Sequence, residues 1–390
     1  MKILHTSDWH LGAKIEGKDR LEEQEKVLDE IIRVSFDYDV QIVIIAGDVF
    51  HTKTPSSEAE DLFFKTVERL SDNGNRLVFV LSGNHDDPLR LGAGRPLAEK
   101  FNIILATELD SVNILKTKVD ARARIIDAGR GFVKVKCGEE YASIGFLPYF
   151  GSEKIKELAN SETYPVGVKK ICETIDSNFN LDSLNIFVGH LFLVGGKVGG
   201  VGEIRVGESL AISEDDLPQK AHYKALGHLH SAQKIGEDCF YSGTITNLRA
   251  KDDAPQVNII VGDKNGVTDV KHVVLKNALR VCEIVANNIA VAYQKVNEAG
   301  PNALVYLTIN QQLGLKADDL RALRQQFPNI ISVKLKINSS SSEQLSEIKL
   351  DLLSDRELFV EFYKSINGAN PPEDLVNLFL ECRGENNASN

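Results

Sequence analysis

The first third of the chain alternates short apolar runs with longer amphipathic segments. Apolar residues at positions 21, 27, 28, 31 and 32 follow the spacing of a helix with one buried face. The unbroken apolar run at positions 42–45 is typical of a strand buried on both faces. These patterns predict strand, helix, strand, helix and strand over Lys2–Thr6, Asp19–Tyr38, Gln41–Ala46, Ser56–Ser71 and Arg76–Leu81. Such an order favours an α/β fold with helices covering both faces of a sheet.

Further strands are predicted near Ala142–Leu147, Asn185–Val188 and Tyr223–Leu226. A glycine-rich stretch, Val194–Gly207, interrupts this pattern. It lacks the GxxxxGK[ST] order of a phosphate-binding loop, and no clear helix follows it. Two interpretations stay open, a mobile surface loop and a flap over the substrate.

The pattern changes near Thr268. Four strands are predicted at Val270–Leu275, Arg280–Ala286, Ala303–Ile309 and Ile330–Ile337, with helices at Ala290–Ala299 and Ala317–Gln326. They form a small α+β unit, and four serines at 339–342 then suggest a linker. Two short amphipathic helices follow at Ser354–Ser365 and Pro372–Cys382. We therefore expect three domains, at 1–267, 268–338 and 339–390.

Charge argues weakly against a nucleic-acid binder. The chain has 390 residues, 43% of them hydrophobic and 26% charged, which suits a folded protein of two or three domains. Its net charge is -11, whereas nucleic-acid binders usually have a basic surface. Residues 343–390 contain ten acidic and four basic residues and so account for -6 of this charge. Metal-binding carboxylates also count as negative although a bound ion neutralises them.

The five cysteines are dispersed and include no CxxC pair. This spacing argues against a disulfide framework and against a zinc–cysteine site. The chain begins with a strand-like segment instead of an apolar leader, and no apolar run approaches the roughly 20 residues of a membrane span. We therefore expect a cytoplasmic protein.

Five short polar motifs stand directly after predicted strands. They are Asp8-Trp9-His10, Gly47-Asp48, Gly83-Asn84-His85-Asp86, Gly189-His190 and Gly227-His228-Leu229-His230. Because sites in α/β proteins form beyond the carboxyl ends of strands, all five motifs can converge at one edge. Their carboxylates, amide oxygen and imidazoles suit divalent ions such as manganese, iron or zinc.

The motifs supply more candidate ligands than one ion needs: Asp8, His10, Asp48, Asn84, His190, His228 and His230. Two ions roughly 3.5–4 Å apart require a bridging group. Asp48 is the best candidate for the bridge because it follows the most hydrophobic strand. A pair of ions can activate water and hold a phosphodiester, so the motifs indicate metal-assisted phosphoester hydrolysis.

Individual residues of these motifs also have structural explanations. A lone histidine usually has an ordinary structural role, and we expect such roles for His5, His222 and His272. The run Gly83–Asp86 could form a plain turn, since glycine and asparagine favour turns. Five metal-type motifs, each at the end of a strand, nevertheless favour a metal site.

The motifs closely resemble those of the SbcD nuclease family, the bacterial branch of the meiotic-recombination-eleven nucleases. The resemblance rests on Ile3–Gly12, Ala46–Phe50, Ser82–Asp86, Gly227–His230, Tyr241–Thr244 and Asp355–Phe359, and it covers nearly the whole chain. Many calcineurin-like phosphoesterases share the shorter motifs, whereas the string Ile3–Gly12 is specific. The implied fold is an α/β sandwich of sheets covered by helices, with a small α+β capping domain and a C-terminal helical partner-binding segment.

The resemblance also implies roles for individual residues. One manganese ion would be held by Asp8, His10, Asp48 and His230. The second would be held by Asp48, Asn84, His190 and His228. His85 would contact the scissile phosphate and assist catalysis without binding metal. His51 stands where family members have His or Asp; it would help to handle the phosphate, or it is simply an exposed loop residue.

The implied activity is that of a DNA nuclease, an exonuclease on double-stranded ends and an endonuclease on single-stranded or hairpin DNA, in repair and recombination. The capping domain would position DNA and carries Lys271, Lys276, Arg280, Arg321, Arg324, Lys334 and Lys336. The tail helices would dock onto an SbcC-type coiled-coil ATPase, or else pack on their own core. A homodimer within a heterotetramer is implied, with its interface expected on the early helices.

Two other functions stay open. A small-molecule phosphoesterase could use the same metal core, but protein phosphatases of this class have GD-x-x-D-R-G and GNHE. Here Asp48 is followed by Val49-Phe50-His51-Thr52, and the third motif ends in Asp86. A DNA-end scaffold without activity would be expected to lose a ligand, and all seven are present together with His85.

Overall fold

The computed structural model describes residues 1–112, 121–197, 210–250, 253–311, 317–337, 356, 359–360, 363–364 and 369–383. The chain divides into two compact units, Met1–Ile337 and Asn338–Asn390. The predicted serine linker at 339–342 and residues 198–207 of the glycine-rich stretch lie outside the described residues.

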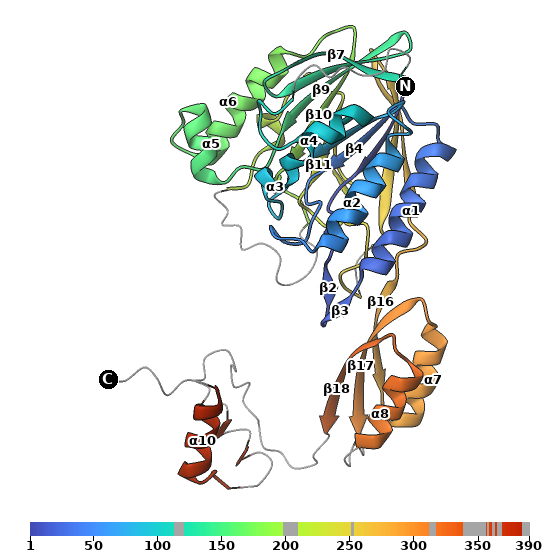
Figure 1. The fold of residues 1–390 in the computed structure, drawn as a ribbon, viewed down its shortest axis with the longest axis vertical. Helices are drawn as coiled ribbons and strands as arrows, with labels where there is room; N and C mark the ends of the chain where they lie inside the picture. The colour runs from blue at the N-terminus through green and yellow to red at the C-terminus, as the bar shows by residue number, and fades with distance from the viewer. Residues whose placement is uncertain are drawn as a thin grey trace. The chain divides into compact units, whose positions relative to one another are not determined.

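Two large β-sheets form the body of the first unit (Figure 1). One has six strands in the order β15-β14-β1-β4-β5-β6. They are β1 (Lys2–Thr6), β4 (Ile42–Ala46), β5 (Leu77–Leu81), β6 (Ile103–Ala106), β14 (Gln256–Asp263) and β15 (Gly266–Val274). The strands β1, β4, β5 and β6 run parallel, and β14 and β15 extend the sheet in antiparallel pairing.

The second sheet has seven strands in the order β12-β13-β11-β10-β9-β8-β7. They are β7 (Ala123–Gly129), β8 (Phe132–Cys137), β9 (Glu140–Leu147), β10 (Leu184–His190), β11 (Tyr223–Gly227), β12 (Gln233–Ile235) and β13 (Cys239–Tyr241). The four central strands β9, β10, β11 and β13 are parallel. The carboxyl ends of β10 and β11 therefore lie at one edge, as do those of β1, β4 and β5 in the first sheet.

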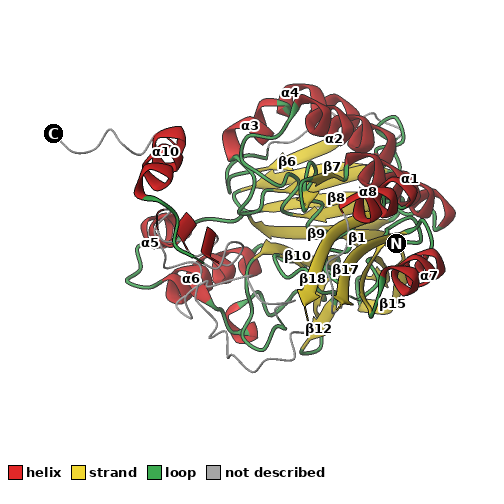
Figure 2. Cartoon of the chain, turned by 90° about the horizontal axis from the view of Figure 1, so that it is seen from below, coloured by secondary structure: helices red, strands yellow, loops and turns green. Residues whose placement is uncertain are grey.

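Strand β4 illustrates how the sequence builds both layers. Side chains alternate across a strand, so an unbroken apolar run must be covered on two faces. Val43 and Ile45 pack with the helices α1 (Leu21–Asp37) and α2 (Ser57–Leu70), while Ile42 and Ile44 pack against the other sheet. Figure 2 shows the helices lying over the stacked strands. The strands and helices predicted for the first third of the chain are thus present.

The outer face of the second sheet is covered by α5 (Ser152–Ala159) and α6 (Tyr164–Ser177), which bury Ile155, Ile171 and Ile175 on it. The remaining short elements of this body are β2 (Lys14–Ile15), β3 (Lys18–Asp19), α3 (Pro88–Ala93), α4 (Arg95–Ala98), η1 (Glu99–Phe101) and η3 (Glu214–Asp216).

Residues 280–337 form a smaller layer within the same unit. Its parallel strands are β16 (Arg280–Ala286), β17 (Ala303–Gln311) and β18 (Ile330–Ile337), and one face is covered by α7 (Ile289–Ala299) and α8 (Ala317–Gln326). The strand expected at 270–275 is different: it is part of β15, which pairs with β14 in the six-stranded sheet. That assignment to the small α+β unit was wrong, because a local pattern does not reveal which sheet a strand joins.

In the second unit, α10 (Glu373–Arg383) covers the second predicted tail helix. The ring of Phe359 stacks on Phe379 with centroids 4.3 Å apart, and Arg356 forms an ion pair with Glu373 at 2.6 Å. Much of the predicted helix at 354–365 lies outside the described residues. Among the helices that are described, none is long and apolar enough to cross a membrane.

Candidate metal centre

The five motifs lie where the parallel strands end. Asp8 follows β1, Asp48 follows β4 and Asn84 follows β5, while His190 ends β10 and His228 comes directly after β11. The loops are tied to one another by their backbones: Asp8 N–H donates to Gly47 O and His10 N–H to Asp48 O, both at 3.0 Å. The parallel arrangement therefore brings residues of distant sequence to one edge, as the pattern predicted.

Several motif residues have a left-handed backbone. The φ angles of Asp8, His10, Asp48 and His228 are 51°, 45°, 49° and 98°. This region is uncommon for residues other than glycine and costs about 1–3 kcal/mol per residue. Strain of this kind persists only where surrounding contacts enforce it, and it concentrates at functional sites.

A first group of donors consists of Asp8, His10, Asp48 and His230, whose ligand atoms lie within 4.8 Å of one another. The Nε2 atoms of His10 and His230 are 3.1 Å apart, and His10 Nε2 is 3.7 Å from Asp48 Oδ2. Asp8, His10 and Asp48 are buried, and His230 is partly buried. The group matches the four residues that the family resemblance assigns to one ion.

A second group surrounds Asn84. Its Oδ1 atom is 2.9 Å from His190 Nε2 and 2.9 Å from His228 Nδ1. His190 Nε2 also lies 3.4 Å from Asp48 Oδ2. The same oxygen of Asp48 therefore faces both groups, which is the position predicted for a bridging ligand.

The donor set fits bound cations. His190 Nδ1–H donates to Ala46 O at 2.9 Å, so a neutral His190 presents the lone pair of Nε2 to two acceptors, Asn84 Oδ1 and Asp48 Oδ2. Three acceptor atoms at such distances need a positive charge between them. Carboxylate, amide and imidazole donors together suit manganese, iron or zinc.

The pKa values agree with this interpretation. Burial lowers the pKa of His228 to about 3, with a further contribution from His190, and burial also lowers the pKa of His10 well below its ordinary value. Both rings are thus neutral, as a metal ligand must be. Burial also lowers the pKa of His190, but the carboxylates of Asp48 and Asp8 outweigh it and raise this pKa to about 9. A proton on His190 then takes the place of a cation.

Hydrogen bonds orient the carboxylates. Ser7 Oγ donates to Asp8 Oδ2 at 2.5 Å and lies 2.8 Å from Ser242 Oγ. The backbone N–H of His85 donates to Asp48 Oδ1 at 2.9 Å, which leaves Oδ2 directed at the two ligand groups. Partners of this kind fix the orientation of ligands and tune their affinity.

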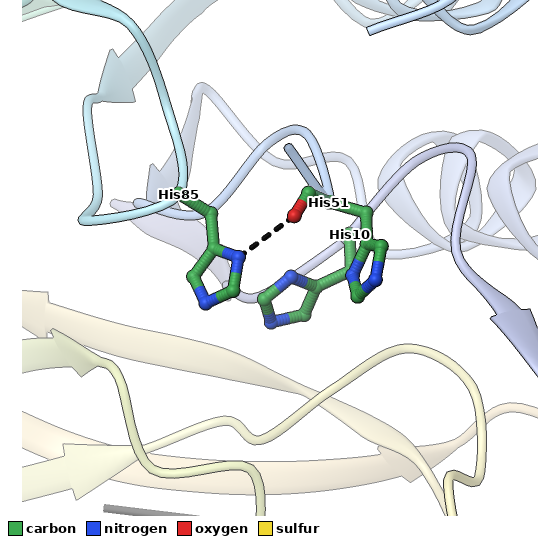
Figure 3. Close-up of side chains that lie close together, drawn as sticks. All are labelled: His10, His51 and His85. Atoms are coloured by element: carbon green, nitrogen blue, oxygen red, sulfur yellow. Dashed lines mark hydrogen bonds between the residues drawn. The ribbon is translucent and has the colours of Figure 1, made fainter. Parts of the chain in front are cut away.

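His85 and His51 lie beside the first group (Figure 3). His85 Nδ1–H donates to the backbone oxygen of His51 at 2.7 Å, so its Nε2 is left to bind or carry a proton. The His85 ring meets His10 edge-on at 4.9 Å and is nearly parallel to the exposed His51 ring at 5.9 Å. Nitrogens of His10, His51 and His85 also approach within 4.8 Å, so the three histidines are a further possible ion-binding group.

Sequence reasoning missed four contributors: Ser7, Ser242, Asp86 and Tyr149. Ser7, Ser242 and Asp86 lie inside motifs of the family resemblance, but nothing in their spacing reveals their partners. Tyr149 follows β9, and its ring stacks on His228. The three histidines expected to be ordinary have other contacts: His5 with Tyr223, His222 with Asn185 and His272 with Asn258.

Comparison with known proteins shows the family of the chain. Residues 1–196 match the family of calcineurin-like phosphoesterases. The D subunit of the nuclease SbcCD of Bacillus subtilis (strain 168) is 29% identical over 398 aligned residues, which cover 98% of this chain and 97% of that protein. The corresponding D subunit of Staphylococcus saprophyticus is 27% identical over 374 residues, 94% of each chain.

A solved structure, TT1561 of Thermus thermophilus, matches 70% of this chain and 99% of its own with 12% identity and a TM-score of 0.38. The family match and the two relatives confirm the predicted family and the predicted enzyme class. The chain belongs to the calcineurin-like phosphoesterases and is similar over nearly its whole length to the D subunits of SbcCD nucleases.

Proposed function

We propose that this chain is the nuclease subunit of an SbcCD-type complex, a two-metal phosphodiesterase that hydrolyses DNA. The observation that carries the proposal is the shared position of Asp48 Oδ2, 3.7 Å from His10 Nε2 and 3.4 Å from His190 Nε2. One carboxylate oxygen between two sets of donors is what a pair of ions requires. Both relatives are named as nucleases, which supports a nucleic acid as the substrate, and the family resemblance favours DNA.

The two ions would be divalent, and manganese is the one that the family resemblance favours. One would be held by Asp8, His10, Asp48 and His230, the other by Asp48, Asn84, His190 and His228. When bound, such ions lower the pKa of water to about 7 and hold the oxygens of a phosphodiester.

His85 supplies proton chemistry beside the first group. Its Nδ1–H is held by His51 O, so Nε2 is the atom that can give a proton to the departing oxygen of the diester. His51 contributes its carbonyl to this orientation, and its ring lies nearly parallel to that of His85. Removing the His85 ring should slow hydrolysis roughly 100- to 10,000-fold, as is typical for the loss of acid–base assistance.

The test compares linear double-stranded DNA with p-nitrophenyl phosphate, a monoester, using manganese-loaded wild type and His85→Ala. The proposal expects DNA degradation that depends on metal, slow turnover of the monoester and a variant that binds two ions by calorimetry but cleaves poorly. Fast hydrolysis of the monoester with intact DNA, even with an ATPase partner added, would instead identify a small-molecule phosphoesterase.

The layer at 280–337 is proposed to position DNA as a capping domain. A cavity of about 450 Å³ is lined by Arg249, by residues of all three strands and by the exposed Lys334 and Lys336. Charge reversal at both lysines should weaken DNA binding and reduce its dependence on salt, because phosphate contacts release counterions. Arg321→Glu, on the exposed side of α8, serves as the control. Equal effects of the two changes would argue against this face.

The tail is proposed to dock onto an SbcC-type ATPase. In this unit, Val376 is buried while Leu375 and Leu378 are exposed, so α10 has apolar side chains on its surface. Spaced apolar anchors of this kind suit helix-in-groove binding. Deleting residues 354–390 should abolish ATPase binding in a pull-down while metal-dependent cleavage of simple substrates continues. Retained binding would contradict this assignment.

A homodimer through the early helices is also proposed. Leu89 and Leu97, in α3 and α4, are 87% and 68% exposed, and the nearby Phe64 and Phe101 are exposed as well. Leu97→Glu should convert the dimer to a monomer in light scattering, since a charge in an apolar interface is costly. Leu181→Glu, at a leucine that is 88% exposed elsewhere, should leave the mass unchanged.

A further inference from the structure

Tyr149 stands beside the second ligand group, two residues beyond the end of β9. Its backbone N–H donates to Ser82 O at 3.1 Å, which ties it to the loop that carries Asn84. Its ring stacks on His228 at 22° with centroids 6.4 Å apart, and it meets His190 edge-on at 6.3 Å. Backbone and ring contacts therefore hold this aromatic side chain against two of the candidate ligands.

The hydroxyl of Tyr149 differs from that of Tyr241, the last residue of β13. Tyr241 is buried, and its hydroxyl donates to Leu191 O and accepts from Leu193 N–H. Tyr149 is partly exposed, and among the described residues its hydroxyl has no hydrogen-bond partner. A phenol normally titrates near pH 10, so this hydroxyl is a donor at neutral pH.

Tyr149 and His85 accompany different ligand groups. His85 contacts His10 of the first group, whereas Tyr149 contacts His190 and His228 of the second. A phosphodiester bound across both groups would thus meet one polar side chain at each. A rigid ring with an open hydroxyl is suited to bind an anionic oxygen with little loss of conformational entropy.

We infer that Tyr149 is a substrate-binding residue whose hydroxyl donates a hydrogen bond to a phosphate oxygen at the second ligand group while its ring packs on His228. The inference rests on the proposed function in one respect, that the substrate is a phosphodiester. It adds a contact that acts on the phosphate and not on the bases, so it serves DNA and small diesters alike.

The experiment uses the full chain loaded with manganese. Tyr149→Phe retains the ring and removes the hydroxyl, and Tyr149→Ala removes both. Tyr141→Phe, near the opposite end of the same strand, is the matched control. Calorimetry measures the binding of manganese and then of inorganic phosphate. Kinetics on bis(p-nitrophenyl) phosphate and on linear DNA give kcat and KM.

Tyr149→Phe should bind manganese as wild type does, bind phosphate about tenfold more weakly and lose about 10- to 100-fold in kcat/KM on both diesters. These factors correspond to one hydrogen bond to a charged group. Unchanged phosphate affinity in Tyr149→Phe would overturn the inference, and so would a loss of manganese binding, since the role would then be structural. If wild type cleaves the small diester but not DNA, the proposed function fails while phosphate binding still decides the role of Tyr149.

Discussion

The carboxylate of Asp86 connects two loops of the candidate site. Its Oδ2 accepts hydrogen bonds from the backbone N–H groups of Gly83 at 2.8 Å and Val49 at 3.2 Å, and its Oδ1 accepts from Phe50 at 2.9 Å. Gly83 precedes Asn84, and Val49 follows Asp48. We therefore predict that Asp86 is needed both for stability and for the position of these two ligands.

The three hydrogen bonds determine how much stability the loss of this carboxylate should cost. Asp86→Ala leaves three N–H groups without this acceptor, and each buried unpaired group costs about 1–3 kcal/mol. Burial and the nearby Asp48 disfavour the ionised carboxylate of Asp86 and thereby raise its pKa to about 6. Removing this charge therefore offsets part of the lost hydrogen bonding. For Asp86→Ala we therefore expect the free energy of unfolding to fall by about 3 kcal/mol, the lower end of the sum over the three N–H groups. Asp86→Asn can keep an oxygen at the position of Oδ2, so it should lose about 1–2 kcal/mol.

The fluorescence of Trp9 provides the assay. It is the one tryptophan of the chain, it is fully buried, and it lies between Asp8 and His10. Urea denaturation followed at this residue in the absence of metal reports unfolding of the unit that holds the site. Calorimetry with manganese should then show affinity reduced about tenfold or more in Asp86→Ala, as for other groups that orient ligands.

The neighbouring Asp87 supplies the control, because its carboxylate caps α3 by accepting from Arg90 N–H at 2.8 Å instead of accepting from the backbone of either ligand loop. Asp87→Ala should cost about 1 kcal/mol and leave manganese affinity unchanged. The reasoning is refuted if Asp86→Ala unfolds at the same urea concentration as wild type and binds both ions equally well. If Asp86→Ala and Asp86→Asn lower the free energy of unfolding equally, the number of hydrogen bonds retained does not determine the effect.

Three further predictions concern the same site. Manganese binding should release a proton, because the pKa of His190 is about 9 and the ion must displace the proton on its ring. The affinity for manganese should therefore rise with pH and level off near pH 9. Calorimetry in buffers of different ionisation enthalpy counts the released protons. Gly227→Ala should abolish ion binding and lower the free energy of unfolding, measured in urea, by about 1–3 kcal/mol, because the added methyl group would overlap Ala46 O and the His190 ring. Gly151→Ala is the control: its methyl group would enter open space, so this change should leave both properties unchanged. Ser7→Ala should weaken manganese binding by roughly 10- to 100-fold in calorimetry through loss of the bond to Asp8, and wild-type affinity would show that Asp8 needs no such support.

Sequence alone determined the parts of the site that depend on local structure. The apolar run of β4 revealed a buried strand, and each polar motif stood at a strand end where a short loop must expose it. Because parallel strands bring their carboxyl ends to one edge, the seven predicted ligands could be expected to meet. In the structure they form two groups that share Asp48.

Only the tertiary structure decided the long-range partners. Ser242 lies 235 residues from Ser7, and Tyr149 reaches His228 from a different strand of the second sheet. Neither contact leaves a periodic signal, since spacing along the chain records only which face of an element is buried. The pairing of β15 with β14 was missed for the same reason: alternation identifies a strand, whereas its neighbour depends on how distant segments pack.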